Sequence, residues 1–421
     1  MSTSAGEAEH PVHAGVISRG PLRELPIEVG VLAAVAFFVA AGFGIVAPAI
    51  PVFARSFGVS RAAAAAVVSA FALMRLASAL GVGRLVNRIG ERVVLGTGIG
   101  IVAVSSALAG LSHDYVQLLV LRGAGGVGSA MFSVSASSLL LGVTTSGQRG
   151  RAMGAFSGGF LVGGIAGPGL GGLITGWSLR APFFIYAATL AAAGAVGLAL
   201  LPRRGARDTQ QSGPHKSPIT VLQALRLPTF QAAALANLAD NWASLGVRAA
   251  IVPLLVVEVL HRSPIWTGIG LTVFTVGNVA TLLLGSRLTD RRGRKPVLLA
   301  GCSGSAAGCA MLIPHPSLSL FLAAMLVFGA GSGLLDVAPG AMLGDVVGGR
   351  GGTVVASFQM AGDLGSLVGP LAAGYLADTA GYGAAFGVTA AVLVLAAAFG
   401  ARAPESLVRS APAAAGEQGG A

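Results

Sequence analysis

Charged residues are scarce in this sequence: they make up 10% of its 421 residues, whereas 54% are hydrophobic. A soluble domain carries about 25% charge, so the composition argues against a soluble protein. Apolar runs of about 20 residues recur along the chain, and each is long enough to cross a hydrocarbon core of ~30 Å. Aromatic residues are few and the 64 glycines are many, which favours closely packed membrane helices. We therefore expect an all-α protein embedded in a lipid bilayer.

Several chemistries lack the residues that they need. The two lysines, Lys216 and Lys295, do not follow the Gly-x-x-x-x-Gly of an ATPase phosphate loop. The six histidines are scattered, so neither a metal nor a cofactor is expected. Cys302 and Cys309 lie within one apolar run, about 10 Å apart along a helix, which is too far for a disulfide. No hydrolase signature stands out, and an enzyme is not expected.

Twelve apolar spans are predicted, in two sets of six. The first set lies near residues 29–53, 62–83, 93–112, 115–141, 152–176 and 182–201. The second set lies near residues 231–257, 265–286, 296–313, 317–342, 352–376 and 382–401. We therefore predict six-helix domains over 29–201 and 231–401, a cytoplasmic linker over 202–230, and disordered cytoplasmic tails over 1–28 and 402–421.

Basic residues are distributed unevenly between the two sides of the predicted membrane. Twenty of the 27 Lys and Arg residues lie in the tails, the linker and the loops on one side. Four lie in the opposite loops, at Arg55, Arg61, Arg180 and Arg262. The positive-inside rule then places both termini in the cytoplasm of a bacterial cell whose inner membrane holds the protein. The same rule accounts for the net charge of +11, so no nucleic-acid partner is expected.

The two halves of the chain repeat each other. Gly44 and Gly246 are 202 residues apart, and so are Pro168 and Pro370. Parallel repeats of this kind occur in some secondary transporters. We therefore expect the protein to move a small molecule across the bilayer by alternating access, as a monomer and without hydrolysing ATP.

Polar side chains occur inside several spans, where an ionisable group is costly and usually faces a cavity or a partner. Span 7 carries five of them within a third of the helix circumference, a stripe predicted to face water or substrate: Asn237, Asp240, Asn241, Ser244 and Arg248. The other intramembrane ionisable residues considered are Arg75, Arg122, Asp336 and Asp363. In span 8 we interpret three residues as part of a cavity wall: Thr272, Thr275 and Asn278.

Proton coupling requires a carboxylate whose pKa moves through neutral as a cation approaches or leaves. Asp240, Asp336 and Asp363 are the candidates, and a static ion pair is the alternative for each. Asp240 and Arg248 lie ~12 Å apart along the helix axis and should not pair directly. Asp240 is therefore expected either to pair across the domain interface, with Arg122 or Arg75, or to remain free to take up a proton.

Four motifs accompany these charges. The loop after span 2 reads Gly83-Arg-Leu-Val-Asn87-Arg88-Ile-Gly90-Glu91-Arg92, and the loop after span 8 reads Ser286-Arg-Leu-Thr-Asp290-Arg291-Arg-Gly293-Arg294-Lys295. Span 4 carries Arg122-x-x-Gly125-Gly126-x-Gly128. Span 5 carries Gly163-x-x-x-Gly167-Pro168-x-x-Gly171-Gly172, and span 11 echoes it with Gly365-x-x-x-Gly369-Pro370.

The two loops resemble the signature G-x-L-a-D-R-x-G-R-R of the major facilitator superfamily. The motifs of spans 4 and 5 resemble those of its drug:proton antiporters, and the resemblance covers residues 29 to 401. It implies two six-helix bundles around a central cavity, gating by the basic loops, a coupling role for Arg122, and export of drugs or amphipathic metabolites in exchange for protons. The sequence departs from the loop signature at Asn87, where the family prefers Asp, at Glu91, where it prefers a base, and at Ser286, where it prefers Gly.

Two other functions remain open at the level of sequence. A sugar or metabolite permease of the same superfamily is the main alternative, and a membrane receptor that no longer transports is the third. The basic loops either latch the two domains together or only fix the topology. The Gly-x-x-x-Gly-Pro run either packs helices tightly or forms a sliding seam between the halves.

Overall fold

The computed structural model describes residues 25–144, 148–201, 220–314, 316–347 and 352–406, and the regular elements in these segments are helices. The helices of the first half are α1 (Ile27–Val46), α2 (Ala49–Arg55), α3 (Arg61–Ile89), α4 (Glu91–Gly110), α5 (Tyr115–Val143), α6 (Arg149–Trp177) and α7 (Ala181–Leu200). Those of the second half are α8 (Val221–Leu225), α9 (Pro228–Asn241), the π-helix η1 (Trp242–Ile251), α10 (Val252–Glu258), α11 (Pro264–Arg292), α12 (Arg294–Ala310), α13 (Leu318–Leu335), α14 (Ala338–Val347), α15 (Gly352–Thr379) and α16 (Tyr382–Arg402).

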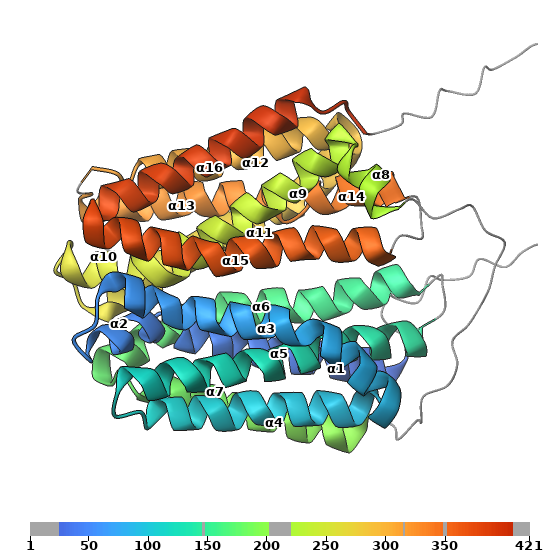
Figure 1. Ribbon diagram of the computed structural model, residues 1–421, viewed down its shortest axis with the longest axis horizontal. Coiled ribbons are helices and arrows are strands. Elements are labelled where there is room, and N and C mark those ends of the chain that lie inside the picture. Colours follow the sequence, from blue (N-terminus) through green and yellow to red (C-terminus); the bar gives the residue numbers. More distant parts are fainter. Residues whose placement is uncertain (1–24, 145–147, 202–219, 315, 348–351, 407–421) are drawn as a thin grey trace, which may run out of the picture.

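The two sets of helices form two bundles that lie side by side. In Figure 1, α1 to α7 fill one half of the molecule and α8 to α16 fill the other, with the long helices roughly parallel. The bundles meet where α15 packs on α3 and where α11 packs on α6. The predicted division into two helical bundles is therefore confirmed.

Ten segments of the described chain are long and apolar enough to cross a bilayer. Two more helices, α12 and α15, occupy the predicted ninth and eleventh spans without meeting the same standard. The helix α12 has only 17 residues, and α15 carries Gln359 and Asp363 in its length. The all-α membrane fold is confirmed, and the count of twelve spans remains a prediction.

The predicted linker and C-terminal tail are wider than the structure allows. Helices α8 and α9 begin inside the range 202–230, because Thr220 and Gln223 form a capping box that starts α8. After α16, Ala403 is only 1% exposed, so ordered chain continues into the predicted tail. The rest of these predictions falls on residues 1–24, 202–219 and 407–421, which lie outside the described residues.

The first helix of each half is interrupted. The helix α1 ends at Val46 and α2 begins after Pro48, because proline lacks an N–H and crowds the preceding turn. In the second half, α9 continues into the π-helix η1, and α10 has Pro253 in its first turn. Interruptions at corresponding positions of two repeats mark the binding site in many transporters, and π-turns are frequent at functional sites.

Glycine allows the backbones of α6 and α1 to touch. Gly163, Gly167 and Gly171 share one face of α6, and a Cβ atom at Gly167 would lie 2.6 Å from the carbonyl oxygen of Ala41 in α1. The next residue, Gly172, faces the opposite way. One motif therefore serves two interfaces, the first inside a bundle and the second between the bundles.

The interface between the bundles is equally close. A Cβ atom at Gly172 would lie 2.7 Å from the backbone nitrogen of Gly268 in α11. The second bundle has its own counterpart of the contact between α1 and α6. A Cβ atom at Gly246 of η1 would lie 2.7 Å from the carbonyl carbon of Gly369, the residue before Pro370.

We expect Gly167→Ala to lower the stability of the protein by roughly 1–3 kcal/mol, the usual cost of overpacking a core. The added methyl group meets the backbone of α1, which has no flexible side chain that could yield. The melting temperature of the purified protein in detergent measures the effect. Gly100→Ala in α4 is the matched control, because nothing lies within 4 Å of its new Cβ atom. Equal melting temperatures for both variants would contradict the close backbone contact.

Candidate substrate cavity and gates

A cavity of about 480 Å³ lies between the two bundles. Its walls come from α1, α3, α5, α6 and α7 on one side and from η1 and α11 on the other. Most of the lining is apolar, and its aromatic members are Phe43, Phe71, Phe132, Phe160 and Tyr186. Its polar members are Arg75, Ser129, Ser133, Arg248 and Thr275. An apolar cavity of this size with a few placed polar groups is typical of a site for a drug-sized molecule.

A second cavity, of about 580 Å³, adjoins the first. The two share Phe160, Gly164, Arg248 and Thr275. The second cavity extends past Gly154 in α6, near the residue where that helix begins, and therefore runs toward the end of the molecule that carries the basic loops. Of the three residues expected in the wall of span 8, Thr275 and Asn278 line this cavity, whereas Thr272 bonds back to the carbonyl oxygen of Gly268 in its own helix.

Two of the predicted coupling carboxylates lie beside each other in the second bundle. Asp240 is 8% exposed and accepts a hydrogen bond of 2.9 Å from the hydroxyl group of Ser332. Asp336 lines the second cavity and accepts a hydrogen bond of 2.8 Å from the amide of Asn278. Arg248 is close enough to interact electrostatically with both, but it forms a direct ion pair with neither in the described part of the chain.

The side chains of the predicted polar stripe of span 7 point in three different directions. Asn237 donates a 2.9 Å hydrogen bond to the carbonyl oxygen of Phe358 in α15, and Asn241 bonds back to Asn237. Asp240 points toward α13, whereas Ser244 and Arg248 line the second cavity. The expectation that the whole stripe faces water or substrate is therefore wrong. Asn237, Asp240 and Asn241 lie in the regular helix α9 and bond to α15 or α13. Ser244 and Arg248, which lie in the π-helix η1, are the members that reach the cavity.

The predicted pairing of Asp240 with Arg75 or Arg122 does not occur. Arg75 of α3 instead lies 3.5 Å from Asp363 of α15, an ion pair that joins the two bundles. Arg122 is 3% exposed and its guanidinium lies 4.8 Å above the centre of the Phe71 ring. Both arginines and Asp363 line a third cavity of about 150 Å³.

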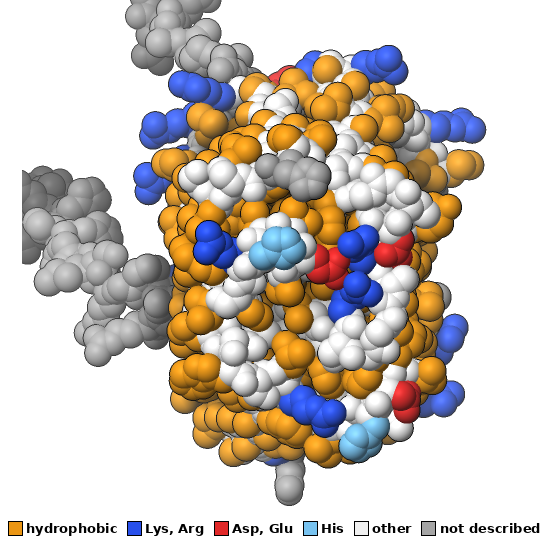
Figure 2. Space-filling model, turned by 90° about the vertical axis from the view of Figure 1, so that its left-hand side faces the viewer, with side chains coloured by type: hydrophobic (Ala, Val, Ile, Leu, Met, Phe, Trp, Pro, Cys, Tyr) orange, Lys and Arg blue, Asp and Glu red, His pale blue; other side chains and the backbone are white. Residues whose placement is uncertain are grey.

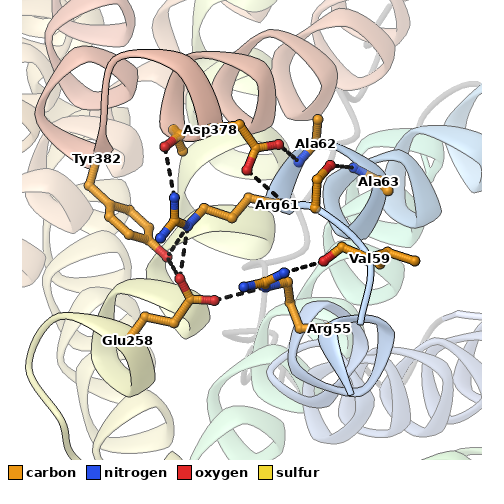
Figure 3. Close-up of polar contacts among 10 residues, drawn as sticks. Arg55, Val59, Arg61, Ala62, Ala63, Glu258, Asp378 and Tyr382 are labelled. Atoms are coloured by element: carbon orange, nitrogen blue, oxygen red, sulfur yellow. Dashed lines mark hydrogen bonds and ion pairs between the residues drawn. The ribbon is translucent and has the colours of Figure 1, made fainter. Parts of the chain in front are cut away.

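A polar network joins the bundles at the end of the molecule where α2 and α10 lie (Figure 2, Figure 3). We call it the Glu258 latch, and it consists of Arg55, Arg61, Glu258, Asp378 and Tyr382. The Nε atoms of Arg55 and Arg61 each lie 2.8 Å from one oxygen of the Glu258 carboxylate. The hydroxyl group of Tyr382 also donates to Glu258, at 2.8 Å.

Asp378 completes the latch at the end of α15. Its carboxylate accepts hydrogen bonds from the backbone N–H groups of Arg61 at 3.0 Å and Ala62 at 2.8 Å, so it caps the first turn of α3 from the other bundle. Asp378 lies beyond the predicted end of span 11. Partial burial acts to raise the pKa of its carboxyl group, but the N–H donors outweigh burial and hold that pKa below its usual value. A negative charge at a helix N-terminus is also favoured by the helix dipole.

The basic loops lie at the opposite end, and each turns at a glycine with a positive φ angle. The angle is 87° at Gly90 and 114° at Gly293, a conformation that side-chain-bearing residues rarely adopt. Arg294 forms ion pairs with Asp290 at 2.8 Å and with Asp345 of α14 at 3.2 Å. Within the described residues, the ion pairs of this loop join elements of the second bundle to one another.

The first basic loop makes fewer contacts. Arg92 donates to the carbonyl oxygen of Leu198 in α7, and Glu91 accepts a 3.2 Å hydrogen bond from Ser138. Asn87 and Arg88 are exposed and make no side-chain hydrogen bond within the described residues, and Arg291 is the exposed counterpart of Arg88 in the second loop. The first loop, which departs from the signature at Asn87 and Glu91, is thus the one with the weaker network.

The segment after α16 was missed as a structural partner of the second loop. The carboxylate of Glu405 accepts hydrogen bonds from the backbone N–H groups of Arg294 at 2.8 Å and Lys295 at 3.2 Å. Ser406 donates a 2.6 Å hydrogen bond to Asp345. The start of α12 is therefore capped by the C-terminal segment.

The Glu258 latch was also missed, although the sequence contained a signal for it. Arg55 and Arg61 are two of the four basic residues on the side that is otherwise poor in them. Arg55 and Glu258 end the equivalent helices α2 and α10, and they are 203 residues apart, within one residue of the repeat offset. Opposite charges at equivalent positions of two repeats indicate a contact across the axis that relates the repeats.

Two bundles with equivalent interrupted helices, a cavity between them and polar contacts at one end define a membrane transporter with a single central site. Within the described residues, no cluster of three His, Cys, Asp or Glu side chains could hold a metal ion. The family model of the Major Facilitator Superfamily matches residues 32–246 and 233–418. The chain belongs to this family of multi-pass membrane transporters, and it is a transporter rather than an enzyme.

Two similar proteins are named for drug resistance. Multidrug resistance protein 2 of Bacillus subtilis is 25% identical over 342 residues, which cover 80% of this chain and 85% of the relative. Quinolone resistance protein NorA of Staphylococcus aureus is 28% identical over 162 residues, which cover 38% of this chain and 40% of the relative.

Solved structures share the fold. A bacterial homologue of the human lysosomal transporter Spinster, in an inward-facing and occupied conformation, has a TM-score of 0.72 at 16% identity, with 89% of this chain and 95% of that chain covered. A mutant of the nucleoside transporter NupG has a TM-score of 0.69 at 15% identity, with 89% of this chain and 99% of that chain covered.

We expect Glu258→Gln to open the end of the molecule that the latch closes, because the variant loses the charge that holds Arg55 and Arg61 together. A cysteine introduced at Ala249, which lines the central cavity, should then react with a membrane-impermeant maleimide added from the latch side several times faster. Arg262→Gln, which removes an exposed charge on the same side but outside the latch, should leave the rate unchanged. Equal rates in all three proteins would show that the latch does not close this end.

Proposed function

We propose that the protein exports drugs or small amphipathic metabolites across a bacterial inner membrane in exchange for protons, with both termini in the cytoplasm. The observation that carries the proposal is the continuous path formed by the two larger cavities, which runs from the aromatic centre toward the basic-loop end. The opposite end is closed by the Glu258 latch. With the basic loops in the cytoplasm, the conformation described here takes up substrate from the inside.

Alternating access requires that the closed end open while the open end closes. The polar contacts between bundles described above join residues 55–75 to residues 258–382, in the half of the molecule away from the basic loops. The close contact of Gly172 with Gly268 lies on the same side. A rocking motion of the two bundles that breaks the latch also brings the basic loops together, so the predicted latching role of the loops belongs to the other conformation.

The relatives support drugs as the substrate class. Two relatives are named multidrug resistance protein and quinolone resistance protein, and export of drugs is one cause of such resistance. The aromatic lining is suited to export of amphipathic molecules, because phenylalanine rings bind apolar surfaces of many shapes. Sugar permeases usually need several amide side chains in the cavity, and the lining of the central cavity contains none.

Asp240 and Asp336 are the best candidates for proton coupling, because the positive charge of Arg248 acts on both carboxylates. Asp336 is reached through the second cavity, and Asp240 lies behind it against Ser332. When Arg248 moves with the substrate or with the bundle, the balance between the protonated and ionised forms of this pair changes. Arg122 lies apart from the pair, above Phe71, so we assign it a role in the first bundle rather than a direct exchange with Asp240.

The test of export is a growth-inhibition screen of drugs in a host that lacks its own pumps, with an empty vector as the reference. Expression of the protein should raise the inhibitory concentration of at least one amphipathic compound. The same compound should release protons from everted membrane vesicles that have been energised. Protection without proton movement would contradict the coupling, and no protection against any compound would contradict drug export.

We expect Asp240→Asn to abolish concentrative transport and to leave some downhill exchange, because an amide keeps the shape of the carboxylate but does not take up or release a proton near neutral pH. Asp336→Asn tests the second member of the pair, and Asp363→Asn is the control for a carboxylate engaged by Arg75. Uptake into everted vesicles with and without a pH gradient measures both modes. If Asp240→Asn still concentrates substrate at the wild-type rate, Asp336 becomes the coupling residue.

A further inference from the structure

The charge of the central cavity is of one sign. Among the residues that line it, Arg75 and Arg248 carry ionised groups and no residue is acidic. The small cavity beside it adds Arg122, a buried residue that is only 3% exposed. The carboxylate that lines the small cavity, Asp363, is already engaged by Arg75. The aromatic centre therefore has an excess of positive charge.

Arg248 has hydrogen-bonding capacity to spare. The Cζ atom of its guanidinium lies 4.6 Å from the centre of the Phe274 ring, and its Nε donates a long 3.4 Å hydrogen bond to the carbonyl oxygen of Ser244. Its terminal nitrogens make no hydrogen bond or ion pair within the described residues. A guanidinium fixed in this way presents two parallel N–H donors, the geometry that binds a carboxylate or sulfonate.

Arg75 and Arg122 also favour a negatively charged ligand. The ion pair of Arg75 with Asp363 is loose at 3.5 Å, and the Arg75 side chain is 46% exposed, so part of its guanidinium faces the cavity. The Nε atom of Arg122 is buried without a hydrogen-bond partner in the described structure. An unpaired buried cation is costly, and an anion in the adjoining cavities offsets that cost.

The nearby carboxylates do not cancel the preference of the cavity for an anion. Asp336 lies in the second cavity, on the far side of Arg248, and is occupied by Asn278. Asp240 lies behind Ser332 and lines neither of the larger cavities. A cationic group in the aromatic centre would therefore meet arginine before it met a carboxylate.

From this arrangement we propose that the central site binds amphipathic anions, with the acidic group of the ligand on Arg248 and Arg75 and its aromatic body among the phenylalanine rings. The proposal rests on the proposed function, because it names the chemical class of the exported molecule. Carboxylates and sulfonates on fused aromatic rings are the simplest ligands of this class. Molecules that carry only a positive charge are poor ligands for the same site.

Three naphthalene derivatives of equal size test the proposal: 2-naphthoate, the neutral 2-naphthylmethanol and the cationic 2-naphthylmethylammonium. Binding to the full-length protein in detergent is measured by titration calorimetry, with empty micelles as the reference for partition. We expect 2-naphthoate to bind about tenfold tighter than the cation, the difference that one charge-assisted pair supplies. Failure of 2-naphthoate to bind, or tighter binding of the cation, overturns the proposal.

Arg248→Gln should weaken the binding of 2-naphthoate by about tenfold and leave the binding of the neutral alcohol unchanged. Arg248→Lys, which keeps the charge but loses the planar donor pair, should retain part of the affinity. Arg262→Gln, on the exposed loop, should change neither. An equal loss for acid and alcohol in Arg248→Gln assigns Arg248 a packing role and overturns its contact with the anion.

The flux of 2-naphthoate in proteoliposomes separates this proposal from the proposed function. Binding as described without flux would support the anion site and contradict export. Proton-driven flux of cationic compounds alone, together with no binding of 2-naphthoate, would support export and contradict the anion site.

Discussion

Helices in a bilayer gain no hydrophobic free energy by leaving lipid for one another, so they are held together by close contact of their surfaces. In this protein the contact is made by glycine. Gly44 of α1 packs against Gly167 and Pro168 of α6, and its neighbour Phe43 lines the central cavity. Glycine brings the backbones together, and phenylalanine on the adjacent position holds a space open. The shape of the cavity therefore depends on how these two residue types alternate along the first helix of the chain.

The interface between the bundles combines partly exposed ion pairs with a close glycine contact. The two ion pairs of Glu258 are partly accessible, with side-chain exposures between 21% and 32%, and such pairs contribute only about 0–1 kcal/mol each. Several weak bonds that break together suit an interface that must open repeatedly. The backbone contact of Gly172 with Gly268 gives the same interface a fixed point that does not depend on charge.

Much of the fold could be predicted because it follows from hydropathy and repetition. The apolar helices follow from local hydropathy, and ten segments are long and apolar enough to cross a bilayer. The two halves follow from the repeat. The direction of each side chain in span 7 could not be predicted, because Asn237 and Asp240 find their partners on α15 and α13, which are distant in sequence. The partners of Asp240 and Arg75 also depend on helices distant in sequence, and hydropathy contains no information about them. The Glu258 latch was within reach, because Arg55 and Glu258 occupy equivalent ends of the two halves.

The equivalence of Arg55 and Glu258 has a consequence for how such a protein can arise. Two residues in equivalent positions that touch lie close to the axis relating the halves. In a symmetric dimer of identical half-length chains, each residue on that axis would meet a copy of itself, so arginine would face arginine or glutamate would face glutamate. Like charges in contact repel. The salt bridge of Arg55 with Glu258 at 2.8 Å is therefore available only to two halves whose sequences differ at this position.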